Sequence, residues 1–185
     1  MEKNRLEAFS DGVLAIIITI MILELKQPVS DNLKDLLALG PTLLAYLLSF
    51  LFIAIYWVNH HLIFRRAETI NVGILWSNIA WLFVMSFIPF CTACVGTYPT
   101  SWAPLSLYFA DMALASITSH IMVRLITREN GHDYKLGPRS IVSLAGYTAA
   151  AVFGGLCPYL AYIVVAAITC WWIVPMKDEQ VTKEP

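Results

Sequence analysis

The sequence predicts an all-α integral membrane protein with six transmembrane helices in each subunit. Of its 185 residues, 58% are hydrophobic and only 14% are charged. A soluble domain of this size could not bury so much apolar surface, whereas a lipid bilayer would cover it. The charged residues fall in short clusters between apolar runs, as expected when each charge in the hydrocarbon core costs about 2.5–3.5 kcal/mol. Residues 1–185 are therefore expected to form a single six-span domain.

Six apolar runs approach the roughly 20 residues that cross a bilayer. In chain order they are Leu6–Leu25, Pro41–Phe64, Ile70–Val95, Trp102–Ile126, Ser140–Gly155 and Pro158–Pro175. We expect Pro89 to kink the third run. The last two runs are short, but Gly154, Gly155 and Pro158 favour a tight turn between them over one long helix. Gly146 and Gly154 suggest close contacts between helices.

Positive charge orients these spans. With six spans, ten of the twelve lysines and arginines fall on one side, and only Lys26 and Lys34 fall on the other. Cytoplasmic loops are enriched in such residues, so both termini are expected in the cytoplasm of a multi-pass protein of the cell membrane. The first run begins with charged residues and is not followed by a small-residue cleavage site, so we interpret it as a retained span.

Several function classes find no support. The net charge of −1 gives no basic surface for nucleic acid. Cys91 and Cys94 form a lone C-x-x-C pair without a second pair or nearby histidine, which favours buried small residues over a metal or redox site. No nucleophile–base set or metal motif supports an enzyme, and no cofactor is expected. Asp111 and His120 in the fourth span indicate either a proton or ion site or hydrogen bonds between helices, and we favour the latter.

The first span carries the most information. At about 100° per residue, one stripe runs along the whole helix. It consists of Arg5, Phe9, Gly12, Ile16, Thr19 and Leu23, with Ile20 at its border. Asp11 lies about 140° away from Ile16, and Ser10 is also displaced from the stripe. The helix thus has an apolar stripe with one hydroxyl and a separate polar spot near its cytoplasmic end.

An aspartate within a span needs a partner or an aqueous path. At the same depth the second span carries polar and aromatic groups, and so does the start of the third. They are Trp57, Asn59, His60 and His61, then Asn71, Ser77 and Asn78. We expect a packed network between these groups and Ser10 and Asp11 that fixes the rotation of the first helix. The alternative is that Asp11 lies at the membrane interface.

The series Arg5-x-x-x-Phe9-Ser10-Asp11, followed by Gly12-Val13-x-Ala15-Ile16-x-Ile18-Thr19 and Leu23-Glu24, resembles the signature of the transmembrane-protein-175 family of potassium channels. The match is dense over about twenty residues, and the six-span layout extends it. The resemblance implies a homotetramer whose first helices line a central pore. It also implies a prokaryotic type, with one unit per chain. The Thr-Val-Gly-Tyr-Gly filter of conventional potassium channels is absent from the sequence.

In this family a ring of aliphatic side chains on the first helix forms the constriction, which maps by resemblance to Ile16. Further layers map to Thr19 or Ile20, then Leu23. A ring of isoleucines would dewet and block ions until the helices separate. Thr19 hydroxyls could bind a dehydrated potassium ion next to Ile16, which favours potassium modestly over sodium. On periodicity alone, ordinary helix packing explains the same residues.

Two charged residues bracket the stripe. Glu24 at its outer end would give four copies a negative mouth that enriches cations, although an interfacial glutamate without that role is equally expected. Arg5 resembles the family's motif arginine and is expected to hold the inner entrance through carboxylates or carbonyls. The leading hypothesis is a potassium-permeable channel. The alternatives are a proton-coupled transporter or proton-permeable channel, and a non-conducting scaffold.

Overall fold

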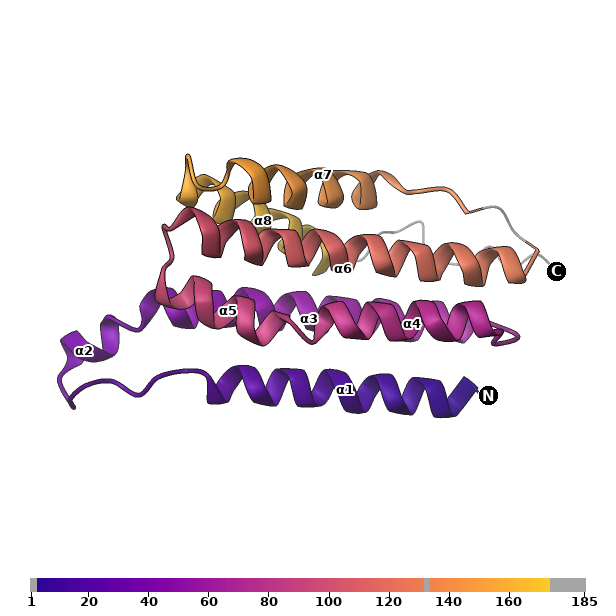
Figure 1. Ribbon diagram of the computed structural model, residues 1–185, viewed down its shortest axis with the longest axis horizontal. Helices are drawn as coiled ribbons and strands as arrows, with labels where there is room; N and C mark the ends of the chain where they lie inside the picture. The colour runs from indigo at the N-terminus through magenta and orange to yellow at the C-terminus, as the bar shows by residue number, and fades with distance from the viewer. Residues whose placement is uncertain (1–2, 132–133, 174–185) are drawn as a thin grey trace.

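The computed structural model describes residues 3–131 and 134–173, and every regular element in these residues is a helix. In chain order they are α1 (Lys3–Leu23), α2 (Leu33–Leu37), α3 (Gly40–Arg66), α4 (Val72–Met85), α5 (Ile88–Thr97), α6 (Trp102–Glu129), α7 (Pro138–Phe153) and α8 (Pro158–Ile173). The long helices lie side by side along one direction, with α1 at one edge of the bundle and α7 at the opposite edge (Figure 1).

Four segments of the described chain are long and apolar enough to cross a membrane. They are Lys3–Leu23, Leu33–Arg66, Val72–Thr97 and Trp102–Glu129. The two remaining helices, α7 and α8, have 16 residues each. At about 1.5 Å per residue each is roughly 24 Å long, somewhat less than a typical hydrocarbon core. α7 packs against α6, and α8 packs against α7 and α3. Their short lengths agree with the prediction that the last two spans are short (Figure 1).

The third predicted span is broken into two helices. Pro89 has no N–H to bond the carbonyl of Met85, and its ring crowds that carbonyl. The chain therefore leaves the helix at Ser86 and Phe87 and resumes as α5. At the break, the Ser86 N–H bonds back to the carbonyls of Leu82 and Phe83 at 3.0 and 3.2 Å. The expected kink is confirmed, and it is large enough to interrupt the helix.

The predicted turn between the last two helices is also confirmed, because α7 ends at Phe153 and α8 begins at Pro158. The two helices touch where α7 has glycine. A methyl group on Gly146 would collide with the side chain of Ile168, and one on Gly154 would lie 3.3 Å from the Ala161 Cβ. The close contacts expected at both glycines are therefore present.

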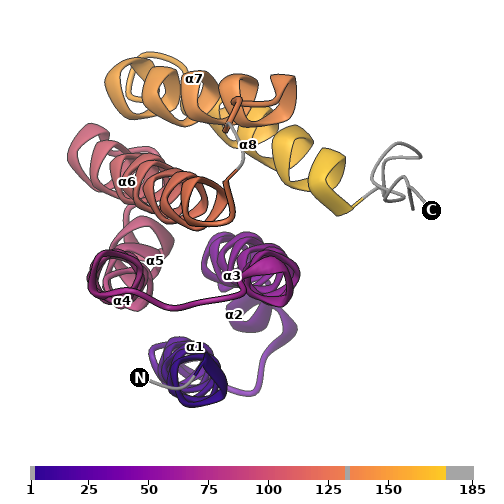
Figure 2. The same ribbon diagram turned by 90° about the vertical axis from the view of Figure 1, so that its right-hand side faces the viewer.

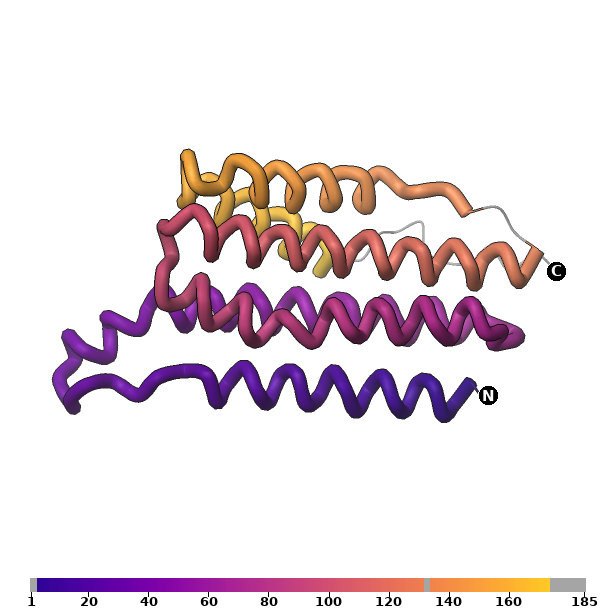
Figure 3. The backbone as a smooth tube through the Cα atoms, viewed as in Figure 1, coloured from indigo at the N-terminus to yellow at the C-terminus, as the bar shows by residue number. Residues whose placement is uncertain are grey.

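Seen end-on, the bundle is built in layers that begin with α1 (Figure 2). α3 and the α4–α5 pair form the next layer, and α1 packs against all three. α6 follows, and then α7 with α8. The trace in Figure 3 shows that α1 reaches the second layer through a long connection containing α2. The short helix α2 was not predicted from the sequence. The predicted sixth span ends at Pro175, which lies outside the described residues.

Candidate pore helix and its polar anchor

One face of α1 packs against the rest of the subunit. Its residues are all at most 3% exposed: Leu6, Ser10, Leu14, Ile17 and Met21. They recur every three or four positions, which places them on one side of an α-helix. This face is apolar apart from the Ser10 hydroxyl, so burial against α3, α4 and α5 fixes which side of α1 points inward.

The predicted stripe lies on the other side of the helix. Ile16 is 58% exposed and Leu23 is 81% exposed, and Arg5, Phe9, Gly12, Thr19 and Ile20 are also exposed. At about 100° per residue, the stripe centres roughly 140° from the packed face. A single subunit therefore leaves uncovered the residues that were predicted to face a pore.

A chain of hydrogen bonds anchors the packed face. The His60 Nε2–H donates to Asn78 Oδ1 at 2.8 Å, and Asn78 Nδ2 donates to Ser10 Oγ at 2.9 Å. The Ser10 hydroxyl donates in turn to the carbonyl of Leu6 at 2.9 Å. The three side chains come from α3, α4 and α1 and are all buried. The buried polar groups satisfy one another, and the Asn78–Ser10 bond sets the rotation of α1.

Two further contacts support this anchor. The His60 ring is stacked between Phe64 and Trp81, with ring centroids 4.3 and 5.0 Å away. On the neighbouring side of α1, the Trp57 indole N–H donates to Asp11 Oδ1 at 2.8 Å, at an exposed position. Asp11 and Ser10 therefore hold α1 to α3 and α4 through separate partners.

Four residues expected in this network lie elsewhere. His61 is exposed, because it follows His60 by one position and is turned about 100° around α3. Asn71 caps α4 and bonds Glu129, Ser77 donates to the carbonyl of Ile74 in its own helix, and Asn59 lines a different cavity. Including these four in the network was wrong, since a shared depth in the membrane does not imply a shared face.

Arg5 and Phe9 also lie outside the network, on the exposed stripe. Within the subunit, as far as the structure describes it, Arg5 has no carboxylate or carbonyl partner, so its expected role stays a prediction for the assembled protein.

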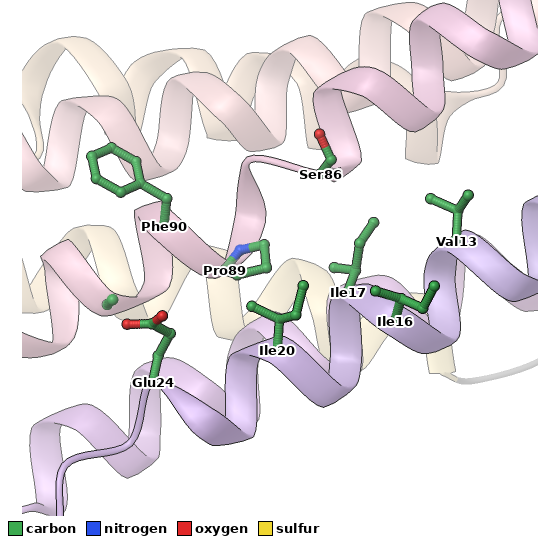
Figure 4. Close-up of a pocket in the computed structure, with 9 residues that line it drawn as sticks. Val13, Ile16, Ile17, Ile20, Glu24, Ser86, Pro89 and Phe90 are labelled. Carbon is green, nitrogen blue, oxygen red and sulfur yellow. The ribbon is translucent and has the colours of Figure 1, made fainter.

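A groove of about 410 Å³ runs beside the exposed stripe, between α1 and the break in the third span (Figure 4). Its α1 side carries Val13, Ile16, Ile17, Ile20 and Glu24, and its other side carries Ser86, Pro89, Phe90 and Ala93. The break at Ser86 and Phe87 therefore lies across this apolar groove from Ile16 and Ile20.

Two polar residues of α1 accompany the isoleucines. The Thr19 hydroxyl donates to the Ile16 carbonyl at 2.8 Å, so its proton is engaged while its oxygen remains exposed and able to accept. Glu24 follows the last residue of α1, is exposed and borders the groove. Both are placed where an ion beside the stripe could meet an oxygen atom.

Asp111 lies apart from α1, on α6. It is 7% exposed, and its Oδ2 atom has no hydrogen-bond partner among the described residues. His120 uses Nδ1 to donate to the Ser116 carbonyl of its own helix at 2.7 Å. We had expected Asp111 and His120 to form hydrogen bonds between helices. That expectation is wrong for His120, whose described bond lies within α6, and Asp111 Oδ2 forms no such bond in the described residues. Cys91 is buried and Cys94 half-buried.

Two features of the interior were missed by the sequence analysis. Lys3 Nζ donates to the carbonyls of Arg65 and Ala67 at 3.4 and 3.0 Å, which ties the start of α1 to the end of α3. Ser49 Oγ lies 2.7 Å from Thr92 Oγ1 and 2.9 Å from the Tyr108 hydroxyl, which joins α3, α5 and α6. Neither involves a motif, and only a three-dimensional arrangement brings these positions together.

The sequence is similar to proteins that are named as ion channels. The sequence model described as endosomal/lysosomal potassium channel TMEM175 matches residues 5–89. A protein of Chryseobacterium sp. (strain P1-3) named potassium channel is 38% identical over 186 residues, which cover 96% of this chain and 95% of that one. A zebrafish protein named endosomal/lysosomal proton channel TMEM175 is 27% identical over 65% of this chain, but over only 24% of its own length.

A solved structure shares the fold. The crystal structure of a lysosomal potassium-selective channel TMEM175 homolog from Chamaesiphon minutus superposes with a TM-score of 0.83 and 28% sequence identity. The match covers 93% of this chain and 96% of that one. The resemblance first noted in twenty residues of α1 thus extends to nearly the whole chain.

Proposed function

Because the chain belongs to the TMEM175 family of ion channels, we propose that it is a potassium channel whose ions pass along the exposed stripe of α1. The supporting observation is the orientation of that helix. Its packed face is anchored by the Ser10–Asn78–His60 hydrogen bonds, and Ile16 and Leu23 are left uncovered on the other side. An apolar stripe with an exposed threonine oxygen suits a narrow cation path.

A single subunit cannot enclose a pore with one helix, so the path requires several copies. We propose a homotetramer in which four α1 helices surround the axis. Ile16 would form a ring that excludes water, with Ile20 and Leu23 as further layers. Thr19 oxygens would bind a partly dehydrated potassium ion beside Ile16. Glu24 residues at the helix ends would raise the cation concentration at the outer mouth.

The proposal includes an orientation in a cell membrane. The end of the bundle that holds the start of α1 and the ends of α3 and α6 also carries most of the arginines and lysines of the sequence. Positive charge on one side favours the cytoplasm for that end, and hence for the N-terminus. Six spans would return the C-terminus to the same side.

Proton permeation is the second candidate, and two observations favour it. Asp11 is an exposed carboxylate on α1, on a different side of the helix from Ile16, and its one described partner is the Trp57 indole N–H. Asp111 is buried in α6 with a carboxylate oxygen that lacks a described partner. The zebrafish relative is also named a proton channel. Buried carboxyl groups within membrane spans often mark proton paths.

Purified protein in liposomes distinguishes these functions. A potassium gradient should drive flux that continues when a protonophore collapses the pH gradient. Sodium in place of potassium should give a smaller flux. Flux that follows the pH gradient alone would assign the chain to proton transport. If no ion flux occurs under any gradient, only a scaffold role would remain.

A further inference from the structure

A second cavity lies far from α1, at the end of the bundle where α3 and α6 finish and α7 begins. Its volume is about 390 Å³, within the range of small-ligand pockets. Its lining residues come from α3, α6, α7 and α8 and from the connection between α6 and α7. Figure 2 looks onto this end of the bundle and shows how these four helices are arranged. Phe52, Ile63 and Val123 form part of its apolar wall. None of the residues proposed for the pore lines it.

Inside the cavity, several polar groups lack partners in the described part of the chain. Ser119 is only 7% exposed, lines the cavity and makes no hydrogen bond through its hydroxyl. His120 engages Nδ1, but its buried Nε2 has no partner. Asn59 also lines the cavity with an unpaired amide. Asn59 is only half-buried, whereas Ser119 and the His120 Nε2 atom are buried. Buried polar groups are nearly always satisfied in native proteins, so these two unpaired groups indicate a polar ligand.

The charge of the lining residues selects the kind of ligand. Arg66, Lys135 and Arg139 contribute three cations, and no described lining residue is acidic. The Arg139 guanidinium lies over the Trp171 ring, 5.3 Å from its centroid, which restricts its position. The start of α7 is at the same place, and no described side chain caps it. Cations and free helix N–H groups both favour an anion.

Tyr134 adds a further donor. It lies in the connection between α6 and α7, and burial raises the pKa of its hydroxyl, so the group stays protonated and can donate to an anion. Its ring meets His120 edge-on, with centroids 6.4 Å apart.

We propose that this cavity binds the phosphate group of an anionic phospholipid from the leaflet next to the basic end of the bundle. The depth of the cavity supports a lipid over a soluble anion, because it extends between membrane helices and carries apolar side chains beside its cations. Basic pockets between transmembrane helices commonly hold lipid headgroups. The site is independent of the proposed pore, and a failure to conduct would not affect it.

Native mass spectrometry of the purified, intact protein tests this site. The probes are phosphatidylglycerol, phosphatidylcholine and inorganic phosphate, each titrated separately. Phosphatidylglycerol should bind, and the paired substitution Arg66→Gln with Lys135→Gln should weaken it about 25-fold, or roughly fivefold per charge removed. Ser119→Ala should weaken binding severalfold without changing net charge.

The matched control is Arg65→Gln with Arg128→Gln, which removes two exposed cations from the same end but outside the cavity. It should retain binding within about twofold. Equal losses in the two pairs would show diffuse electrostatic attraction and overturn the site. Equal binding of phosphatidylcholine, or preferential retention of inorganic phosphate, would overturn the anionic-lipid assignment. All substituted charges are exposed, so thermal unfolding should remain close to that of the parent protein.

Discussion

Replacing Asn78 with leucine would test how α1 is held in its orientation. The substitution keeps a side chain of similar size at a fully buried position of α4. It removes the acceptor for the His60 Nε2–H and the donor to Ser10 Oγ. Ser10 can still donate to the Leu6 carbonyl, so the main unsatisfied group would be the imidazole N–H.

The size of the effect follows from these two losses. A buried donor without a partner costs about 1–3 kcal/mol. Loss of one hydrogen bond between membrane helices adds about 0.6 kcal/mol on average. The expected destabilisation of Asn78→Leu is therefore about 2–4 kcal/mol. For a chain of this length that corresponds to a fall in the melting temperature of about 4–16 °C.

Thermal unfolding of the purified protein in detergent, followed by circular dichroism, measures this change. Ser77→Ala is the matched control, since that hydroxyl bonds only within its own helix, and it should shift the melting temperature by less than about 2 °C. Adding His60→Phe to Asn78→Leu should recover at least part of the loss, because phenylalanine keeps the stack between Phe64 and Trp81 but has no N–H. If Asn78→Leu costs no more than Ser77→Ala, the anchor does not hold α1.

Two further substitutions address the proposed pore. Ile16→Asn should wet the constriction, raise single-channel conductance severalfold and reduce the preference for potassium over sodium in bilayer recordings; unchanged conductance and ion preference would remove Ile16 from the ion path. Asp11→Ala should break the Trp57–Asp11 hydrogen bond and lower the stability of the assembly by about 1 kcal/mol, with little change in selectivity. For Asp11→Ala, size-exclusion chromatography after mild heating measures the stability of the assembly, and reversal potentials in mixed potassium and sodium measure selectivity. Normal assembly with altered selectivity would contradict the structural role of Asp11.

The helices of this protein were predictable because the bilayer demands long apolar segments. The helix break at Pro89 and the turn between Gly154 and Pro158 were also predictable, since both residue types disrupt helices through local stereochemistry. Periodicity placed Arg5, Ile16 and Leu23 on one side of α1, but it could not say whether that side packs against a neighbour or faces a pore. Only the resemblance to a channel family favoured the pore. These features depend on residues close together in the chain.

Contacts between helices were harder to predict. His60 and His61 are adjacent in sequence, yet only His60 points towards Asn78, because the rotation of α3 is set by packing that no local pattern reveals. The Ser49–Thr92 contact joins hydroxyls 43 positions apart. The cavity around Ser119 is formed by four helices and one connection, so its lining could not be identified from any single segment.

Localising ions in the assembled protein tests the central claim most directly. The assembled structure would be determined in rubidium, which replaces potassium and gives strong density. The account predicts that the α1 stripe surrounds a central axis, with ion density on that axis beside Ile16 and Thr19. A stripe that faces lipid or packs against a neighbouring subunit, with no ion on the axis, would contradict it.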